Sequence, residues 1–297
     1  MMCLEPLLIA NPKTEKYSFY HNNRFNVDEY KRVYGKEAYI QVPCGHCEAC
    51  VERRSNEWAT RVYYEWLYSK NSIFFTLTYS EEFLSINPVQ FCCGAHIEEC
   101  ELPVLVKRDA QLFMKRLRKH VGNGLRFFLG AEYGERDARP HYHVILFNSP
   151  TSLSLDELHE IIKKCWSYGK IDFQETIIQR VMYVAKYCYS CSLLPRNLIK
   201  NFVFPFILCS RRPAIGHHYY EDPQVRDYHN RTLETIVTID DGKIMPMPRL
   251  YRTKIFSEDN KEVLYQQFIN DEKKPPSDDR IRTFLKRFEQ KKRGKSI

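Results

Sequence analysis

The sequence contains no long apolar run, no internal repeat and no low-complexity tract. A membrane-spanning helix needs about 20 consecutive apolar residues, and the apolar stretch 7–10 (LLIA) is too short for a secretory signal segment. Only 11 of the 297 residues are glycine, whereas 43% are hydrophobic and 14% are aromatic. This composition excludes a disordered or fibrous chain. We expect a soluble protein with one large domain or two small ones, which stays in the compartment where it is made.

Positive charge is concentrated in two segments of the chain, whose net charge is +8. Residues 280–297 contain eight Lys or Arg residues against one acid, Glu289. The second set consists of Lys107, Arg108, Lys115, Arg116, Arg118 and Lys119. Two basic regions on a nearly neutral body indicate a polyanionic partner, which we interpret as nucleic acid. A solvated basic end is the alternative for the terminal segment.

The eleven cysteines form an odd set in a long chain without a signal segment, which favours reduced thiols or metal ligands over disulfides. Cys44, Cys47 and Cys50 have the spacing of zinc ligands, but a structural zinc ion usually has four ligands. The candidates for the fourth are His46, Cys92, Cys93, His96 and Cys100. Structural Zn²⁺, free thiols and a redox role all remain open for this cysteine knuckle.

Hydrophobic periodicity predicts an α+β fold. Alternating residues predict strands over 73–79, 125–132, 140–147 and 170–173, and apolar residues at helical spacing predict helices over 106–121, 154–166 and 177–189. In the helix over 106–121 most of the basic residues point away from the apolar face. The order strand, helix, strand, strand, helix, strand, helix favours an antiparallel central sheet with helices packed on it, a ferredoxin-like or RRM-like arrangement.

The same patterns predict a three-part organisation. Residues 1–42 are interpreted as an irregular arm, residues 43–216 as the main domain with the cysteine knuckle at its start, and residues 217–297 as an extension. Within the main domain, residues 80–104 are interpreted as an insertion or long loop. The extension becomes irregular and ends in a predicted basic amphipathic helix over 281–288.

Two histidines give the sharpest chemical signal. His141 and His143 alternate in a predicted strand, so both imidazoles project from one face of the sheet. Glu132 lies nine residues earlier, and a hairpin register that pairs it with His141 also places Gly130 opposite His143. Two imidazoles and a carboxylate suit Mg²⁺, Mn²⁺ or Zn²⁺. In the alternative interpretation, Glu132 and the histidines are solvated surface residues.

Two tyrosines follow on the helix predicted over 177–189. Tyr183 and Tyr187 are four residues apart, so they share one flank of the helix, away from its buried stripe. Such a pair is often a packing pair. A nearby cation such as Lys186 would promote loss of the phenolic proton, which has a pKa of about 10, and so would favour a nucleophilic role.

These motifs together resemble a known superfamily. The segment 141–143 (HYH) is similar to the His-hydrophobic-His motif of the H-U-H endonucleases, 75–79 (FTLTY) to their first motif and 183–187 (YVAKY) to their paired-tyrosine motif. The chain also resembles the replication-initiation proteins of gokushovirus-type microviruses, which are small single-stranded DNA phages. The segments that carry this second likeness are 43–50 (PCGHCEAC), 113–118 (FMKRLR), 130–134 (GAEYG) and 210–216 (SRRPAIG).

The resemblance implies an initiator of rolling-circle replication. It implies His141 and His143 as ligands of Mg²⁺ or Mn²⁺ with Glu132 as the third ligand, and Tyr183 and Tyr187 as nucleophiles that become linked to a 5′-phosphate. Lys186 carries over as a residue of the tyrosine motif. The implied partners are single-stranded DNA, the phage replication origin, and a host DNA polymerase and helicase, in the host bacterial cytoplasm and with no membrane partner.

Two other functions are compatible with these residues. A relaxase or single-strand transposase would use the same metal chemistry, although the tyrosine of conjugative relaxases precedes the histidines, whereas here the tyrosines follow them. A non-catalytic, zinc-stabilised protein that binds single-stranded nucleic acid would use the histidines and tyrosines only for packing or base stacking.

Overall fold

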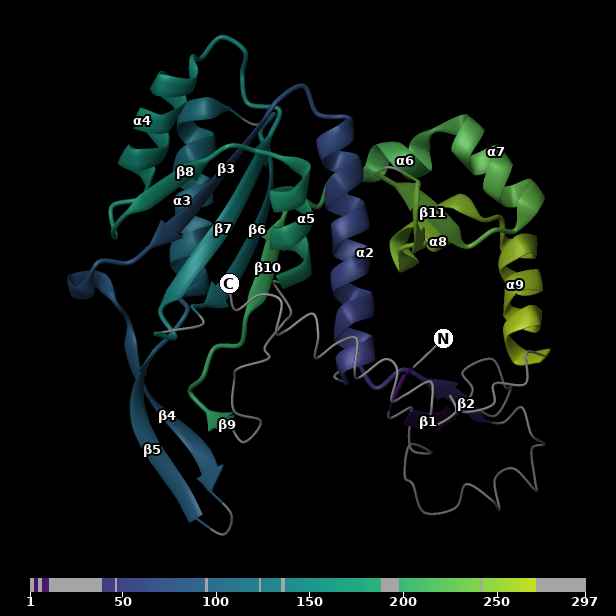
Figure 1. Cartoon of the computed structure of the whole chain (residues 1–297), viewed down its shortest axis with the longest axis horizontal. Coiled ribbons are helices and arrows are strands. Elements are labelled where there is room, and N and C mark those ends of the chain that lie inside the picture. Colours follow the sequence, from purple (N-terminus) through teal and green to yellow (C-terminus); the bar gives the residue numbers. More distant parts are fainter. Residues whose placement is uncertain are drawn as a thin grey trace. The chain divides into compact units, whose positions relative to one another are not determined.

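A five-stranded antiparallel sheet lies at the centre of the larger unit of the protein in the computed structural model (Figure 1). The structure describes residues 3–4, 7–10, 39–45, 47–93, 96–122, 124–134, 137–187, 198–240 and 242–270. The chain divides into one compact unit of residues 1–53 with 257–297 and a second unit of residues 54–256. The helix α2 (Glu48–Leu67) continues across this boundary. The predicted domain organisation, 1–42, 43–216 and 217–297, stays a prediction.

The central sheet confirms the predicted α+β class. Its strand order is β10-β6-β7-β3-β8, with every neighbouring pair antiparallel. The strands are β3 (Ser72–Thr78), β6 (Arg126–Tyr133), β7 (Pro140–Phe147), β8 (Ile171–Gln174) and β10 (Phe206–Cys209). The first four match the predicted strands. The edge strand β10 was not predicted.

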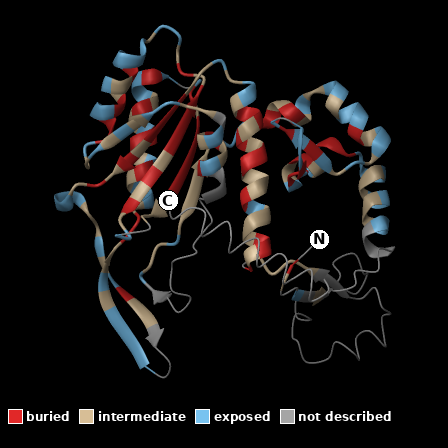
Figure 2. Ribbon diagram, viewed as in Figure 1, coloured by how far each residue is buried: buried red, intermediate tan, exposed pale blue. Residues whose placement is uncertain are grey.

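Two helices cover one face of the sheet. Apolar residues of α3 (Lys107–Val121) and α4 (Leu155–Cys165) pack with Phe75, Tyr142 and Val144 in the main hydrophobic core. The helix α4 begins with the predicted capping box, in which Ser154 and Glu157 each bind the backbone of the other. Figure 2 shows the sheet as the most continuously buried part of the larger unit.

The opposite face of the sheet packs against α5 (Ile178–Tyr187) and the part of α2 within the larger unit. Val181 and Val184 of α5 are fully buried, as the predicted stripe requires, and they contact the cluster that contains Phe74 and Ile145. The helix α5 therefore lies on the face from which His141 and His143 project, because their neighbour Tyr142 points into the other core.

Residues 80–104 form an inserted β-hairpin rather than a loop. After a short 3-10 turn, η4 (Glu81–Phe83), the strands β4 (Ile86–Cys93) and β5 (His96–Pro103) pair with each other. The strand β9 (Leu198–Lys200) adds to β4. The side chains of β5 are largely exposed, so little apolar alternation marked this hairpin in the sequence.

Regular elements also follow Gly216, where the sequence shows no clear pattern. They are α6 (His217–Glu221), α7 (Pro223–Thr232), β11 (Ile236–Ile239), β12 (Lys243–Pro246), α8 (Arg249–Ile255) and α9 (Glu258–Asn270). Tyr219 stacks on Tyr251 and contacts Tyr64 of α2, with ring centroids 5.0 Å and 4.2 Å apart. The basic helix predicted over 281–288 lies outside the described residues.

In the smaller unit, β1 (Leu7–Ala10) pairs antiparallel with β2 (Tyr39–Val42). Within the part of the chain that the structure describes, no helix is both long and apolar enough to cross a bilayer.

Candidate active site

His141, His143 and Glu132 meet on one face of the central sheet. The register of β6 and β7 pairs Glu132 with His141 and Gly130 with His143, as the sequence predicted. The Nε2 atoms of His143 and His141 lie 2.8 Å and 3.1 Å from the same Glu132 oxygen, Oε1. The ligand atoms of all three residues lie within 4.8 Å of one another. The fold therefore brings the three candidate ligands together.

The other ring nitrogen of each histidine also has a polar partner. Nδ1 of His141 lies 3.0 Å from the backbone carbonyl oxygen of Arg139, which fixes the proton on Nδ1. Nδ1 of His143 lies 2.9 Å from the hydroxyl of Thr76. Partners of this kind direct the Nε2 lone pair toward a metal ion. The donor set and its orientation therefore fit a divalent cation bound by Glu132 and the two Nε2 atoms.

Thr76 was not predicted as a site residue. It lies on β3 directly opposite His143, within the segment 75–79 that resembles the first H-U-H motif. Pairing between β3 and β7 is a contact between distant segments, so only the fold shows that the Thr76 hydroxyl orients a histidine.

The electrostatics of the three residues favour a bound positive charge. Burial by itself would raise the pKa of Glu132, but hydrogen bonds and charge from the two histidines outweigh burial and lower it to about 2. Burial would lower the pKa of His141, yet the hydrogen bond and charge of Glu132 raise it above its usual value. Both shifts show that the site stabilises a cation between the carboxylate and the imidazoles.

The first of the two predicted nucleophiles lies beside this site. Tyr183 projects from α5, is 46% exposed, and its ring centroid lies 6.5 Å from that of His143 in an edge-to-face arrangement. Lys186 and Tyr187 lie in the last turn of α5, but their side chains lie outside the described residues. The helix α5 therefore carries an exposed phenol to the metal-binding face.

The predicted basic residues of α3 differ in their surroundings. Arg116 donates hydrogen bonds to the Cys165 carbonyl oxygen (2.8 Å) and the Tyr168 hydroxyl (3.2 Å). Arg118 lies over the ring of Phe127, and Lys107 lies near the ring of Phe206. The exposed members of the set are Lys107, Arg108, Lys115 and Lys119. Moreover, α3 covers the sheet face opposite the histidines, so DNA binding by this helix stays a prediction.

Comparisons with known proteins point to phage replication. A family of replication-associated proteins of the ORF2 type matches residues 72–190. Replication-associated protein VP4 of Bdellovibrio phage phiMH2K is 28% identical over 241 residues, which cover 75% of this chain and 70% of that protein. The chain belongs to the microvirus-type replication-associated proteins.

Two further members of this family are similar over shorter spans. Replication-associated protein ORF2 of Spiroplasma virus 4 is 34% identical over 54% of this chain and 48% of its own length. Replication-associated protein ORF4 of Chlamydia phage 1 is 26% identical over 55% of this chain and 41% of its own length. The segment that matches the family contains Glu132, His141, His143 and both tyrosines of α5.

A second group of metal-ligating residues lies outside that segment. The structure gathers Cys44, Cys47 and Cys50 with Cys3, so the fourth member comes from the arm that the sequence indicated as irregular. The expectation for the fourth residue is corrected accordingly, since this group includes neither His96 nor Cys100 among the described candidates. His46 and the side chains of Cys92 and Cys93 lie outside the described residues.

Proposed function

We propose that this replication-associated protein initiates rolling-circle replication by cutting the origin strand with a tyrosine at a metal centre. The observation that supports the proposal most directly is the convergence of Glu132 Oε1 and the two histidine Nε2 atoms beside Tyr183. A relaxase or transposase would have the same site, but the relatives of this chain are phage replication-associated proteins.

In the proposed reaction the chain supplies the nucleophile and the ligands. Glu132, His141 and His143 would hold Mg²⁺ or Mn²⁺, which, when bound, polarises the scissile phosphate and offsets the charge of the transition state. The phenolate oxygen of Tyr183 or Tyr187 forms a bond to phosphorus. The bond from phosphorus to the 3′-oxygen breaks, and that oxygen takes a proton to become a 3′-OH.

The covalent link makes the cut reversible. A 5′-phosphotyrosine retains the energy of the phosphodiester bond, so a 3′-OH can attack it later and rejoin the strand. In each new round the second tyrosine would cut the regenerated origin while the first link is released. Two tyrosines one helical turn apart suit this exchange, and Lys186 between them would favour loss of the phenolic proton.

The partners follow from this chemistry. Single-stranded DNA with the phage origin is the substrate, and the released 3′-OH would prime a host DNA polymerase. A host helicase would open the duplex ahead of it, in the host bacterial cytoplasm.

The test uses the full-length protein with Mn²⁺ and single-stranded oligonucleotides that tile the genome encoding the chain. We expect one oligonucleotide to be cut and to remain attached to the protein in denaturing gels. The double variant His141→Ala, His143→Ala should lose cleavage by at least about 100-fold, as when a group that stabilises the transition state is removed. Its affinity for single-stranded DNA should change little, because phosphate contacts supply most of that affinity.

Tyrosine variants identify the nucleophiles. Tyr183→Phe and Tyr187→Phe should each still form the adduct, and the double variant should form none. Tyr228→Phe is the matched control, because Tyr228 is an exposed tyrosine on α7, outside the site. An adduct in the double variant, or full cleavage by the double histidine variant, would refute the assignment. Binding without any adduct in the wild type would favour the non-catalytic alternative.

A further inference from the structure

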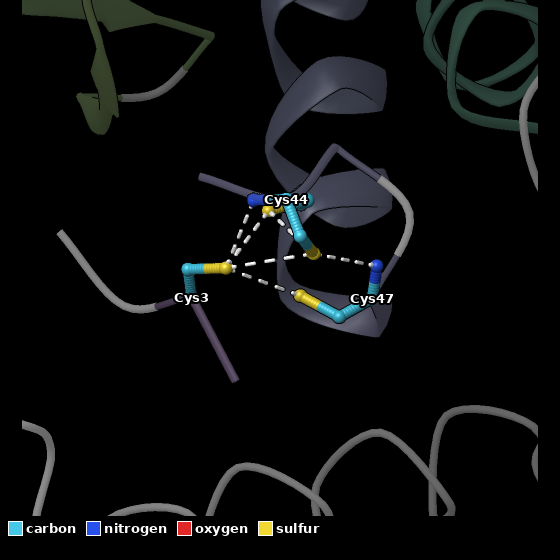
Figure 3. Close-up of side chains that lie close together, drawn as sticks. Cys3, Cys44 and Cys47 are labelled. Carbon is cyan, nitrogen blue, oxygen red and sulfur yellow. Dashed lines mark hydrogen bonds between the residues drawn. The ribbon is translucent and has the colours of Figure 1, made fainter. Parts of the chain in front are cut away.

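Four cysteine sulfurs come together in the smaller unit. Cys3 lies four residues before β1, Cys44 and Cys47 lie in the turn between β2 and α2, and Cys50 lies in the first turn of α2. The sulfur of Cys3 is 3.6 Å from that of Cys44, 3.7 Å from that of Cys47 and 3.5 Å from that of Cys50. Figure 3 shows Cys3, Cys44 and Cys47 pointing toward one another.

These distances match the edges of a tetrahedron around one metal ion. With Zn–S bonds of about 2.3 Å, tetrahedral coordination places neighbouring sulfurs about 3.8 Å apart. The distance between Cys44 and Cys50 is 3.9 Å, and all four sulfurs lie within 4.8 Å of one another. A disulfide would need about 2.05 Å. An iron–sulfur cluster would spread the sulfurs over several iron atoms and so separate them further.

Backbone N–H groups already point at the sulfurs. The amide of Cys44 donates to the Cys3 sulfur and that of Cys47 to the Cys44 sulfur, both at 3.3 Å. The amide of Leu4 donates to the Cys47 sulfur at 3.4 Å. Gly45, between the first two cysteines of the knuckle, has a φ of +85°, which glycine adopts without strain. Such hydrogen bonds stabilise thiolates and are typical of the surroundings of a metal ion.

Apolar packing gives little reason for this convergence. Cys3, Cys47 and Cys50 are buried, yet the hydrophobic cluster around them contains only Ala49, Leu4 and Cys44 besides, among the described residues. A core this small contributes little stability to a chain segment. A metal ion would provide the missing stabilisation, because the free energy of binding contributes directly to folding.

We propose that Cys3, Cys44, Cys47 and Cys50 bind one structural zinc ion as four thiolates. Binding displaces the four thiol protons, with no change in oxidation state. The ion ties Cys3, 41 residues before Cys44, to the turn that begins α2 at the open end of the β1–β2 pair. This site is independent of the proposed cleavage reaction, since none of its residues belongs to the histidine site.

The test measures metal in the purified full-length protein. We expect one tightly bound zinc per chain that resists dialysis and is released by a mercurial, which attacks thiolates but not histidine ligands. X-ray absorption at the zinc edge should show four sulfur neighbours at about 2.3 Å. The double variant His141→Ala, His143→Ala should retain this ion, which separates it from any metal at the histidine site.

Cys3→Ser is the decisive variant, and Cys100→Ser is its control because Cys100 is a half-buried cysteine outside the group. Cys3→Ser should bind zinc at least about 10-fold more weakly in competition with a chelator, and Cys100→Ser should bind it as the wild type does. Wild-type protein without zinc, with iron in its place, or with three sulfur neighbours and a nitrogen at the ion would overturn the proposal. These wild-type measurements decide the matter even if Cys3→Ser does not fold.

Discussion

A buried ion pair joins α2 to the start of β6, and its removal should destabilise the larger unit. Arg126 contacts Glu65 through both carboxylate oxygens, and the two side chains are 12% and 1% exposed. Arg126 also donates to the carbonyl oxygens of Pro213 (3.0 Å) and Ala214 (3.1 Å). The Arg126→Ala change therefore removes the charged partner of a buried carboxylate and leaves two backbone carbonyls without this donor.

The expected loss is large. Removing one partner of a buried ion pair costs about 3–5 kcal/mol, because the remaining charge is buried and uncompensated. Glu65 keeps one strong hydrogen bond, from the backbone N–H of Gly216 at 2.8 Å, which favours the lower end of that range. For a unit of this size, about 3 kcal/mol corresponds to a fall in Tm of roughly 6–12 °C.

The assay is thermal unfolding followed by near-ultraviolet circular dichroism, at a pH where the pair is charged. Lys163→Ala is the control, since the pair between Lys163 and Glu160 is more than half exposed and should contribute at most about 1 kcal/mol. The double variant Arg126→Ala, Glu65→Gln has no uncompensated carboxylate. It should lose less than the sum of the two single losses.

The outcome that would refute this reasoning is an Arg126→Ala protein as stable as Lys163→Ala. Strictly additive losses in the double variant would also contradict it, because the two side chains would then act independently. Cleavage of DNA well below the melting temperature should be unaffected, since Arg126 lies at the end of β6 away from the histidines.

Three other perturbations have outcomes that the structure predicts. Tyr142→Phe should cost about 1–3 kcal/mol in urea unfolding, because its buried hydroxyl accepts from the backbone N–H that precedes α3; wild-type stability would contradict this. The double variant Lys115→Ala, Lys119→Ala should reduce the salt dependence of single-stranded DNA binding by roughly 0.7 per lost phosphate contact, whereas Arg116→Ala should chiefly lower the melting temperature; an unchanged slope would exclude α3 from the DNA interface. Burial holds the pKa of His229 below its usual value, so the unfolded chain takes up a proton that the folded chain does not as the pH falls through about 6.5; Tm should therefore rise with pH in this range, and His229→Asn should flatten that rise.

The sequence by itself determined most of the central sheet and the pairing that forms the histidine site. Alternation set the strands, because one side of each strand must face an apolar core. A short hairpin connection then left one register that puts Glu132 opposite His141. These features depend on residues close together in the chain, so pattern and spacing were sufficient to predict them.

Only the tertiary structure decided which distant residues meet. The pattern over 1–42 gave no sign that Cys3 joins the knuckle, because 41 residues separate it from Cys44. Pairing of β3 with β7 brought Thr76 to His143, and packing of α5 on the same face brought Tyr183 beside it. The packing of α3 placed the basic helix on the opposite face. Helical periodicity shows which side of a helix is buried, but the choice of sheet face depends on how the whole core packs, and that information is not local in the sequence.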